Sequence, residues 1–505
     1  MDTFDEKSIK SQYVVGIDLG TTNLKAGLFN TKGTLLAQSE AEFSISRPKK
    51  GLAEQDTEEW WKALKKVLKN LVSEVPDVCV SAMGICSQVG SHIFVDENGQ
   101  ALTKVILWQD QRCSEFVNQL NEKAVNYKDC LSTGYFVDTT AIVARAEWAR
   151  IKEPDIWSKT KYILSPKDYF NLRLTGKFAT DALSQYGIVD DSGAYYKGIL
   201  EFVPNIAEVL PPVLDFRSKL GKVCKMNDEV LDAAFENTIV AVGTMDAYGN
   251  LYGSGAVSHG DGIEVSGTCE IVGVLSRESH PTVGIATFPP VDNLYFHAGP
   301  TKSGGSAMQW FAGELGITVA EMVRLAELAP AGSNGMIFLP YLEGERAPIW
   351  DDEVRGVFFG VSAEHKREHF CRAVIEGVAY SARHLLEEID KSCGFNTNKL
   401  KISGGSSRDA LCCQIRADIS NRMIEKIHVR QSGVLGAALI ATVASGIADN
   451  IGTAAADLVH IEQVYTPDSE LRLLYDHMYS IYRQLYPMLK PAFNELAKLE
   501  NINQN

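Results

Sequence analysis

The chain has 505 residues, and at roughly 100–200 residues per domain this length predicts two or more domains, each with a buried core. Its 64 acidic residues outnumber the 49 basic residues and give a net charge of −15, which argues against a protein that coats nucleic acid. A hydrophobic fraction of 45% with 22% charged residues is typical of a folded globular protein and not of a disordered chain.

The cysteines and the N-terminal segment favour a reducing compartment. Ten cysteines are present without any C-x-x-C pair, so we expect reduced, mostly buried thiols rather than a disulfide framework. The first twelve residues are polar and of mixed charge, unlike a secretion signal, and the sequence contains no run of about 18 apolar residues. The sequence therefore predicts a cytoplasmic protein with neither a membrane partner nor a nucleic-acid partner.

The first predicted elements are three short strands joined by tight turns, which form a β-meander. These strands are expected at residues 13–19, 24–29 and 34–37. A helical pattern follows from residue 56 to residue 72, with Asp56 or Thr57 as its cap. Further strands are expected at residues 80–85 and 93–95. Strands, then a crossover helix, then more strands predict an α/β fold.

A second strand–turn–strand pattern lies halfway along the chain, at residues 263–275. Its turn, Gly267-Thr268, takes the same place between two strands as Gly20-Thr21, and about 250 residues separate the two turns, which is a domain-scale repeat. The sequence therefore predicts two domains of related architecture. The glycine-rich residues 248–255 indicate a boundary, so we expect one domain over 1–252 and a second over 253–505.

Towards the C-terminus, apolar and aromatic residues recur at alternating spacings of four and three from Leu471 to Leu489. This spacing predicts an amphipathic helix whose aromatic stripe packs on the core.

The turn at residues 16–22 is the most informative segment for chemistry. A strand ends in Asp18, and Gly20, Thr21 and Thr22 follow. Such a turn can direct backbone N–H groups and hydroxyls at phosphate oxygens, and a neighbouring carboxylate can hold Mg²⁺. An ordinary β-turn is the alternative. The second turn offers the same donors without a carboxylate, so the two turns together suit a nucleotide held from both domains with a metal on one side.

Two further segments suit the same ligand. Asp246 follows an apolar strand at residues 238–242, where its carboxylate could accept the proton of a hydroxyl that attacks a phosphoryl group. It could equally cap the helix that begins after it. Residues 404–406, Gly-Gly-Ser, join a short strand to a helix and let the backbone approach a flat ligand or a phosphate closely. Neither a P-loop nor a dinucleotide-binding G-x-G-x-x-G motif is present.

Residues 18–22 resemble the first phosphate motif of the FGGY carbohydrate kinases, within the superfamily of actin, sugar kinases and heat-shock chaperone ATPases. Other segments resemble this family, in its xylulose kinase-like branch, in the same order along the chain. They are residues 106–112, 166–176, Asp246, 356–376, 404–408 and 433–438. The resemblance extends from about residue 13 to about residue 490.

The resemblance implies two ribonuclease H-like domains of the actin-like ATPase type that flank a catalytic cleft. The first would bind the sugar and the second ATP, and the reaction would yield ADP and a phosphorylated sugar or polyol. Asp246 would be the catalytic base and Asp18 the ligand of Mg²⁺. The residues assigned to ATP are Gly20, Thr21, Thr22, Lys25, Gly267, Thr268, Gly304, Gly404, Gly405 and Ser406. The residues assigned to the sugar are Gln88, Val89, His92, Trp108, Asp110 and Asp246. We also expect a homodimer.

The substrate loop at residues 84–92 departs from the familiar branches. Val89-Gly90 stands where xylulose kinases carry Met-His and glycerol kinases carry Arg-Glu, and Ala247 stands where glycerol kinases carry glutamine after the aspartate. These departures argue against glycerol and weaken the case for D-xylulose without excluding it. The expected acceptor is a pentulose such as xylulose or ribulose, or a tetritol or pentitol. Gly90 is expected to leave extra room, with His92 or Gln88 supplying a polar contact. His92 could equally be a packed strand residue.

Two other classes of function share this fold. One is an actin-like or chaperone-like ATPase, and residues 108–112 and 166–176 argue against it because such a machine needs no sugar segments. The other is a catalytically silent sugar-binding regulator, and Asp18 and Asp246 argue against it.

Overall fold

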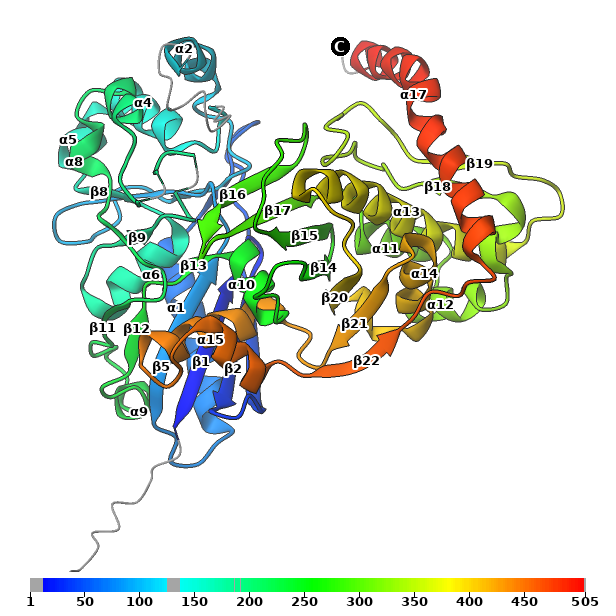
Figure 1. Ribbon diagram of the computed structural model, residues 1–505. Helices are drawn as coiled ribbons and strands as arrows, with labels where there is room; N and C mark the ends of the chain where they lie inside the picture. Colours follow the sequence, from blue (N-terminus) through cyan, green and yellow to red (C-terminus); the bar gives the residue numbers. More distant parts are fainter. Residues whose placement is uncertain (1–11, 125–136, 186, 191, 504–505) are drawn as a thin grey trace, which may run out of the picture. The chain divides into compact units, whose positions relative to one another are not determined.

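The computed structural model describes residues 12–124, 137–185, 187–190 and 192–503 (Figure 1). The chain forms two compact units. Unit 1 comprises Met1–Gly253 and Ser432–Leu458, and unit 2 comprises Ser254–Gln431 and Val459–Asn505. The first boundary lies one residue from the predicted one. The segment Ser432–Leu458, which we expected in the second domain, returns instead to unit 1.

Unit 1 is built on a seven-stranded sheet in the order β11-β12-β5-β1-β2-β3, with β13 also beside β5. The strands are β1 (Tyr13–Leu19), β2 (Asn23–Asn30), β3 (Leu35–Glu42), β5 (Val80–Ser87), β11 (Lys219–Lys222), β12 (Ile239–Ala241) and β13 (Thr244–Met245). β1, β2 and β3 form an antiparallel meander, and β5 lies parallel to β1, β12 and β13. β11 closes this sheet antiparallel to β12.

Unit 2 contains a second seven-stranded sheet in the order β16-β17-β15-β14-β20-β21-β22. The strands are β14 (Gly262–Ser266), β15 (Glu270–Ser276), β16 (Ala286–Val291), β17 (Leu294–Pro300), β20 (Lys399–Gly404), β21 (Met423–Ile427) and β22 (Ile461–Tyr465). From β17 to β22 the strand directions repeat those from β3 to β11 in unit 1. The prediction of two related α/β domains is therefore confirmed.

The crossover helix of unit 1 is α1 (Thr57–Ser73), which buries Trp60, Leu64 and Leu68 in the core. Asp56 is its cap, because the carboxylate accepts hydrogen bonds from the N–H groups of Glu58 and Glu59. In unit 2, α13 (Arg367–Cys393) precedes β20 and buries most of its length.

α15 (Ser432–Ala444) is the element that brings the late segment back to unit 1, where it packs on β1, β5 and α10 (Asp246–Gly253) (Figure 1). Glycines make this packing close. A Cβ on Gly16 would lie 1.9 Å from Val434 O, and a Cβ on Gly84 would lie 2.0 Å from Ala437 O. No side chain fits at either position, so the helix backbone rests directly on the sheet. This contact is the reason why residues 432–458 leave unit 2.

The remaining elements complete the two units. In unit 1 they are β4 (Glu54–Gln55), β6 (Ile93–Val95), β7 (Val105–Ile106), α2 (Ser114–Ala124), α4 (Ile142–Lys152), α5 (Pro154–Lys159), β8 (Tyr162–Leu164), α6 (Pro166–Thr175), β9 (Thr180–Asp181), α7 (Lys197–Phe202), α8 (Ile206–Val209), β10 (Val213–Leu214), α9 (Glu229–Ala234) and α16 (Ile451–Leu458). In unit 2 they are α11 (Gly305–Glu314), α12 (Val319–Ala326), η1 (Ala331–Gly335), β18 (Ile337–Leu339), β19 (Val357–Phe359), η2 (Ser406–Arg408), α14 (Ala410–Ser420) and α17 (Arg472–Asn503).

The predicted C-terminal helix is α17, and its aromatic stripe packs as expected. Tyr475, Met478, Tyr482 and Leu485 are buried in the core of unit 2. In the described residues, no helix combines the length and the apolar character that a membrane crossing requires.

Candidate active site

Two carboxylates stand on either side of the same strand of unit 1. In the register of the sheet, Cys86 of β5 lies opposite Asp18 of β1 and opposite Thr244 of β13, and Asp246 follows β13 directly. Burial raises the pKa of Asp18 to about 6, and Lys25, its partner across the β1–β2 hairpin, opposes the rise. Burial and the charge of Asp18 raise the pKa of Asp246 to about 7. The two predicted acidic residues are thus close enough to interact.

Asp246 is the first residue of α10, where both of its predicted roles remain open. Hydrogen bonding with the backbone of Ala247 opposes the rise of its pKa, as expected of a carboxylate at a helix start. The residue as a whole keeps part of its surface exposed to solvent, so it stays accessible to a ligand. The Asn250 amide donates to Asp246 O at 2.9 Å and accepts from the Ser432 hydroxyl at 2.7 Å, which ties the first turn of α10 to α15.

Asp18 lies against the first turn of α15. A Cβ on Gly433 would stand 2.5 Å from Asp18 Oδ2, so the carboxylate occupies space that only glycine leaves open. The described residues contain no group of three or more His, Cys, Asp or Glu side chains arranged for a metal ion. Mg²⁺ bound through phosphates needs only one or two carboxylates, so Asp18 beside Asp246 fits that ion.

Thr21, which was assigned to ATP, contacts two residues that were assigned to the sugar. Its hydroxyl donates to Gln88 Oε1 at 2.8 Å and accepts from Trp108 Nε1 at 2.9 Å. The Ser91 hydroxyl donates to the same Gln88 oxygen at 3.3 Å. The Thr21 hydroxyl is therefore engaged with predicted sugar residues, whereas Thr22 is exposed on the turn.

Asp110 is fully buried and holds the loop that carries Trp108. Its carboxylate accepts hydrogen bonds from Ala53 N at 2.7 Å and from Arg112 Nε and Nη2 at 2.8 Å. Burial raises its pKa, but the bonds with Arg112 and Ala53 outweigh that effect and lower the pKa overall. The guanidinium of buried Arg145 donates to the carbonyls of Leu107 and Asp110 from the other side. The Asp110 carboxylate is thus hydrogen-bonded by groups of the protein itself.

The expectation of extra room at Gly90 is wrong. A Cβ there would stand 2.8 Å from Thr140 Cβ and 3.3 Å from Trp108 Cβ, so neighbouring side chains already fill the space. The sequence could not show this, because Thr140 is distant along the chain. Val89, beside it, is partly buried.

His92 has the burial of a packed strand residue. Its backbone N–H and carbonyl both pair with Ile106, and its side chain is 6% exposed. Burial and the charge of Arg145 lower its pKa to about 3, so the imidazole is neutral at physiological pH. Its Nδ1 has no hydrogen-bond partner in the described structure, so a substrate contact stays a prediction.

In unit 2, backbone hydrogen bonds gather most of the predicted ATP residues around one turn. Gly267 and Thr268 are exposed at its tip. Gly304 N donates to Thr268 O at 3.0 Å, and Gly405 N donates to Ser266 O at 2.6 Å. Gly404 has φ 89° and its Cβ would stand 2.3 Å from Ser266 O, a position that only glycine can take. Ser406 follows, buried at the start of η2.

Sequence analysis missed two clusters of buried charged residues, one in each unit. In unit 2, Arg416 of α14 contacts Glu264 at 2.5 Å and Glu270 at 2.9 Å, on the two strands of the hairpin. In unit 1, Lys167 of α6 contacts Asp168 and Asp181. The sequence feature that could have indicated them is the presence of charged residues on otherwise apolar faces. Charged residues are rarely buried unless they are paired.

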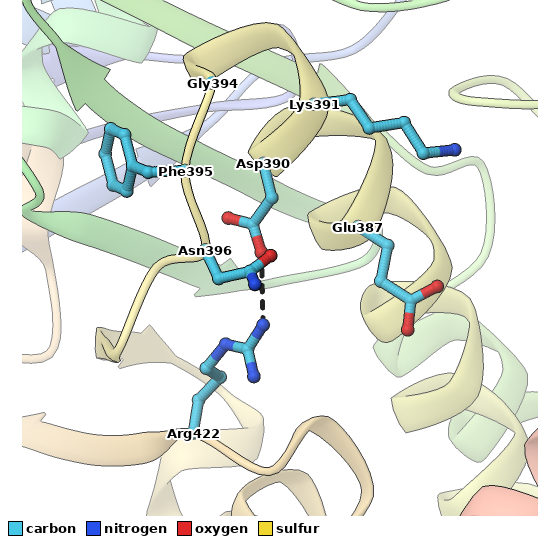
Figure 2. A pocket seen from close by; sticks show the side chains of 7 residues that line it. All are labelled: Glu387, Asp390, Lys391, Gly394, Phe395, Asn396 and Arg422. Atoms are coloured by element: carbon cyan, nitrogen blue, oxygen red, sulfur yellow. Dashed lines mark hydrogen bonds and ion pairs between the residues drawn. The ribbon is translucent and has the colours of Figure 1, made fainter.

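Unit 2 also has a pocket of about 480 Å³ at the C-terminal end of α13, shown in Figure 2. Its lining residues are Glu387, Asp390, Lys391, Gly394, Phe395, Asn396 and Arg422. Arg422 pairs with Asp390 at 3.2 Å, and Lys391 pairs with Glu388 at 2.8 Å. None of the predicted site residues lines this pocket, and its charged groups are paired within the protein.

Comparisons with known proteins identify the family of this chain. A model of the FGGY family of carbohydrate kinases, N-terminal domain, matches residues 13–253, and the C-terminal domain model of the same family matches residues 264–445. The xylulose kinase of Lactococcus lactis is 29% identical and covers 97% of this chain and 99% of its own length. The gluconokinase of Bacillus subtilis is 24% identical, covering 96% and 98%. The solved structure of the xylulose kinase from Rhodospirillum rubrum has a TM-score of 0.82 at 26% identity, covering 95% of this chain and 100% of its own.

Proposed function

Because this chain belongs to the FGGY family of carbohydrate kinases, it is a sugar kinase that uses ATP, and we propose that its acceptor is a ketopentose such as xylulose or ribulose, or a tetritol or pentitol. The observation that carries the chemistry is the pair of interacting carboxylates, Asp18 and Asp246, on the two strands that flank β5: Asp18 near the end of β1 and Asp246 directly after β13. A chaperone-like ATPase or a silent regulator is not favoured, since the full-length relatives named above are sugar kinases.

Asp246 is the proposed base. A general base works best when its pKa lies near the operating pH, and the pKa of Asp246 is about 7. The acceptor hydroxyl gives its proton to the Asp246 carboxylate, and its oxygen forms a bond to the γ-phosphorus of ATP. The bond from that phosphorus to the β,γ-bridging oxygen breaks, and its electron pair leaves with ADP.

Asp18 is the proposed ligand of Mg²⁺. When bound, the ion would neutralise the charge that develops on the phosphoryl oxygens. The raised pKa values of the two carboxylates support a cation here: burial raises both, the charge of Asp18 raises that of Asp246 further, and a bound cation would favour the charged forms.

Both units contribute residues to the proposed ATP-binding set. Unit 1 supplies Gly20, Thr22 and Lys25 around the Asp18 turn, with Thr21 shared with the sugar residues. Unit 2 supplies the second phosphate turn and the adenosine segment. Those residues are Gly267, Thr268, Gly304, Gly404, Gly405 and Ser406.

The proposed sugar contacts centre on Gln88 and Trp108. Their bonds to Thr21 fix both side chains relative to the Asp18 turn, so a hydroxyl bound by them is aligned with the phosphate donors. Asp110 supports this loop, and Val89 and His92 complete the proposed set.

The acceptor is tested by coupled ADP release on the full-length chain. The panel contains D-xylulose, D-ribulose, xylitol, erythritol, D-gluconate and glycerol, each compared by kcat/KM. The proposal expects a ketopentose, xylitol or erythritol to give the highest value. A highest value for gluconate or glycerol would overturn the proposed acceptor class, while leaving the family assignment intact.

We also propose that the enzyme is a cytoplasmic homodimer. The cysteines of the described residues are all free thiols, which fits a reducing compartment. The dimer rests on the family resemblance alone. Light scattering of the purified chain tests it, and a monomer mass at micromolar concentration would contradict it.

A further inference from the structure

The strand that leads to Asp246 is held from behind by a buried ionic cluster. Lys167, on the first turn of α6, is fully buried with its ammonium group against Asp168 and 2.9 Å from Asp181 Oδ1. Burial lowers the pKa of Lys167, but the two carboxylates outweigh this effect and raise the pKa overall. The cation therefore stays charged and anchors Asp181.

Asp181 in turn bonds the strand β13. Its Oδ2 accepts a hydrogen bond from the Thr244 hydroxyl at 2.8 Å and from the N–H groups of Leu183 and Ser184 at 3.2 Å. Thr244 is fully buried and stands two residues before Asp246. A hydroxyl that donates to a carboxylate in a dry interior makes one of the stronger protein hydrogen bonds.

The chain just before Thr244 has little freedom of its own. Gly243 has φ 73°, and a Cβ there would stand 2.1 Å from Ile85 O. The Asn171 amide, also on α6, donates to Val242 O at 2.7 Å. α6 and Asp181 thus hold the chain on both sides of the bend at Gly243, immediately ahead of Asp246.

We propose that Thr244 is a positioning residue for phosphoryl transfer: its bond to Asp181, anchored by Lys167, sets where the Asp246 carboxylate stands relative to the acceptor hydroxyl. The inference rests on the proposed role of Asp246 as base. A base displaced by a fraction of an ångström to about 1 Å loses much of its rate advantage while substrate binding changes little. Losing the Thr244 hydroxyl should therefore lower kcat and leave KM for ATP nearly unchanged.

A second buried threonine, Thr238, is the control that distinguishes a positioning role of Thr244 from a purely structural one. Thr238 is also fully buried, and its hydroxyl donates to Val80 O at 2.6 Å, at the opposite end of β5 from Cys86. Thr238→Val removes a buried hydroxyl bond of the same unit far from Asp246. Thr244→Ser keeps the hydroxyl, and Thr244→Val removes it at nearly constant volume.

The experiment compares kcat, KM and the thermal midpoint of the full-length variants, using ATP and the best acceptor of the panel above. We expect Thr244→Val to lower kcat by about tenfold or more with KM for ATP within about twofold. Thr244→Ser should recover most of kcat, and Thr238→Val should lower the thermal midpoint while keeping kcat within about twofold of the parent. Thr244→Ala removes the hydroxyl without a branched side chain and must show the same fall in kcat.

Equal kcat values for Thr244→Val and Thr238→Val, or a Thr244→Ser variant as slow as Thr244→Val, would overturn the positioning role. Asp246→Asn is measured beside them. Near-normal turnover of Asp246→Asn would defeat the proposed base itself. An inactive Asp246→Asn together with a fast Thr244→Val would defeat only the inference about Thr244.

Discussion

The hairpins at the start of the two sheets have the same topology but different chemistry. Leu19 and Leu24 form the last pair of the β1–β2 hairpin, and Ser266 and Glu270 form the last pair of the β14–β15 hairpin. Asp18 and Val265 therefore hold equivalent positions. Unit 1 places a carboxylate at the turn, whereas unit 2 places an apolar side chain there.

The acidic residues of the second hairpin are neutralised behind the turn. Glu264 and Glu270 are buried against Arg416, and the Ser266 hydroxyl joins them. The unit 2 turn therefore offers neutral backbone and hydroxyl donors, while the unit 1 turn carries the carboxylate of Asp18, which interacts with Asp246 at the start of α10. The same topology thus carries different chemistry in the two units: neutral donors suit phosphate oxygens, and carboxylates suit a proton and a metal ion.

The largest effect should come from Asp246→Asn. Asparagine caps helices as well as aspartate does, so the variant keeps the capping role and loses only the base. We expect kcat to fall by about 100- to 10,000-fold with ATP affinity, measured by calorimetry, nearly unchanged. Asp228→Asn at the cap of α9 is the matched control and should keep its activity. Comparable turnover of both variants would show that Asp246 is only a cap.

The buried cations should matter for stability in both units. Arg416→Met leaves Glu264 and Glu270 buried without a counter-charge, and Lys167→Met does the same to Asp168 and Asp181. We expect each to lower the free energy of unfolding by about 3–5 kcal/mol in urea titrations. Lys69→Met, at an exposed pair with Asp228, should change the free energy of unfolding far less. If Arg416→Met or Lys167→Met lowered the free energy of unfolding as little as Lys69→Met does, the proposed importance of the buried cations would be contradicted.

A smaller effect should follow from crowding the unit 1 turn. Gly433→Ala places a Cβ 2.5 Å from Asp18 Oδ2, so the carboxylate must move. We expect kcat to fall by about tenfold, because Asp18 leaves its place beside Asp246. The control is Gly313→Ala in α11, where a Cβ meets nothing within 4 Å. Equal kcat values for the two variants would mean that the position of Asp18 is unimportant.

Local patterns predicted much of this architecture. The β1–β2 hairpin, the start of α1 with its cap at Asp56 or Thr57, and the strand before Asp246 all follow from neighbouring residues. β3 was expected to end at residue 37 but runs to Glu42, because its later residues alternate exposed and partly buried positions at the edge of the sheet.

Distant contacts were not predictable. The return of α15 to unit 1 depends on backbone contacts from Gly16 and Gly84, more than 300 residues earlier in the chain. The bond from Thr244 to Asp181 and the filling of the Gly90 space by Thr140 are also tertiary contacts. No local pattern marks them, since the residue types involved are ordinary at those positions.

The pH dependence of kcat/KM tests most directly whether a coupled pair of carboxylates in unit 1 performs the chemistry. The base acts when it is deprotonated, so activity should fall as the pH drops through the raised pKa of Asp246, about 7. The charge of Asp18 contributes to that rise, so in Asp18→Asn the fall in residual activity should move to lower pH. An unchanged acid limb in Asp18→Asn, or no acid limb near pH 7 in the parent enzyme, would contradict this account.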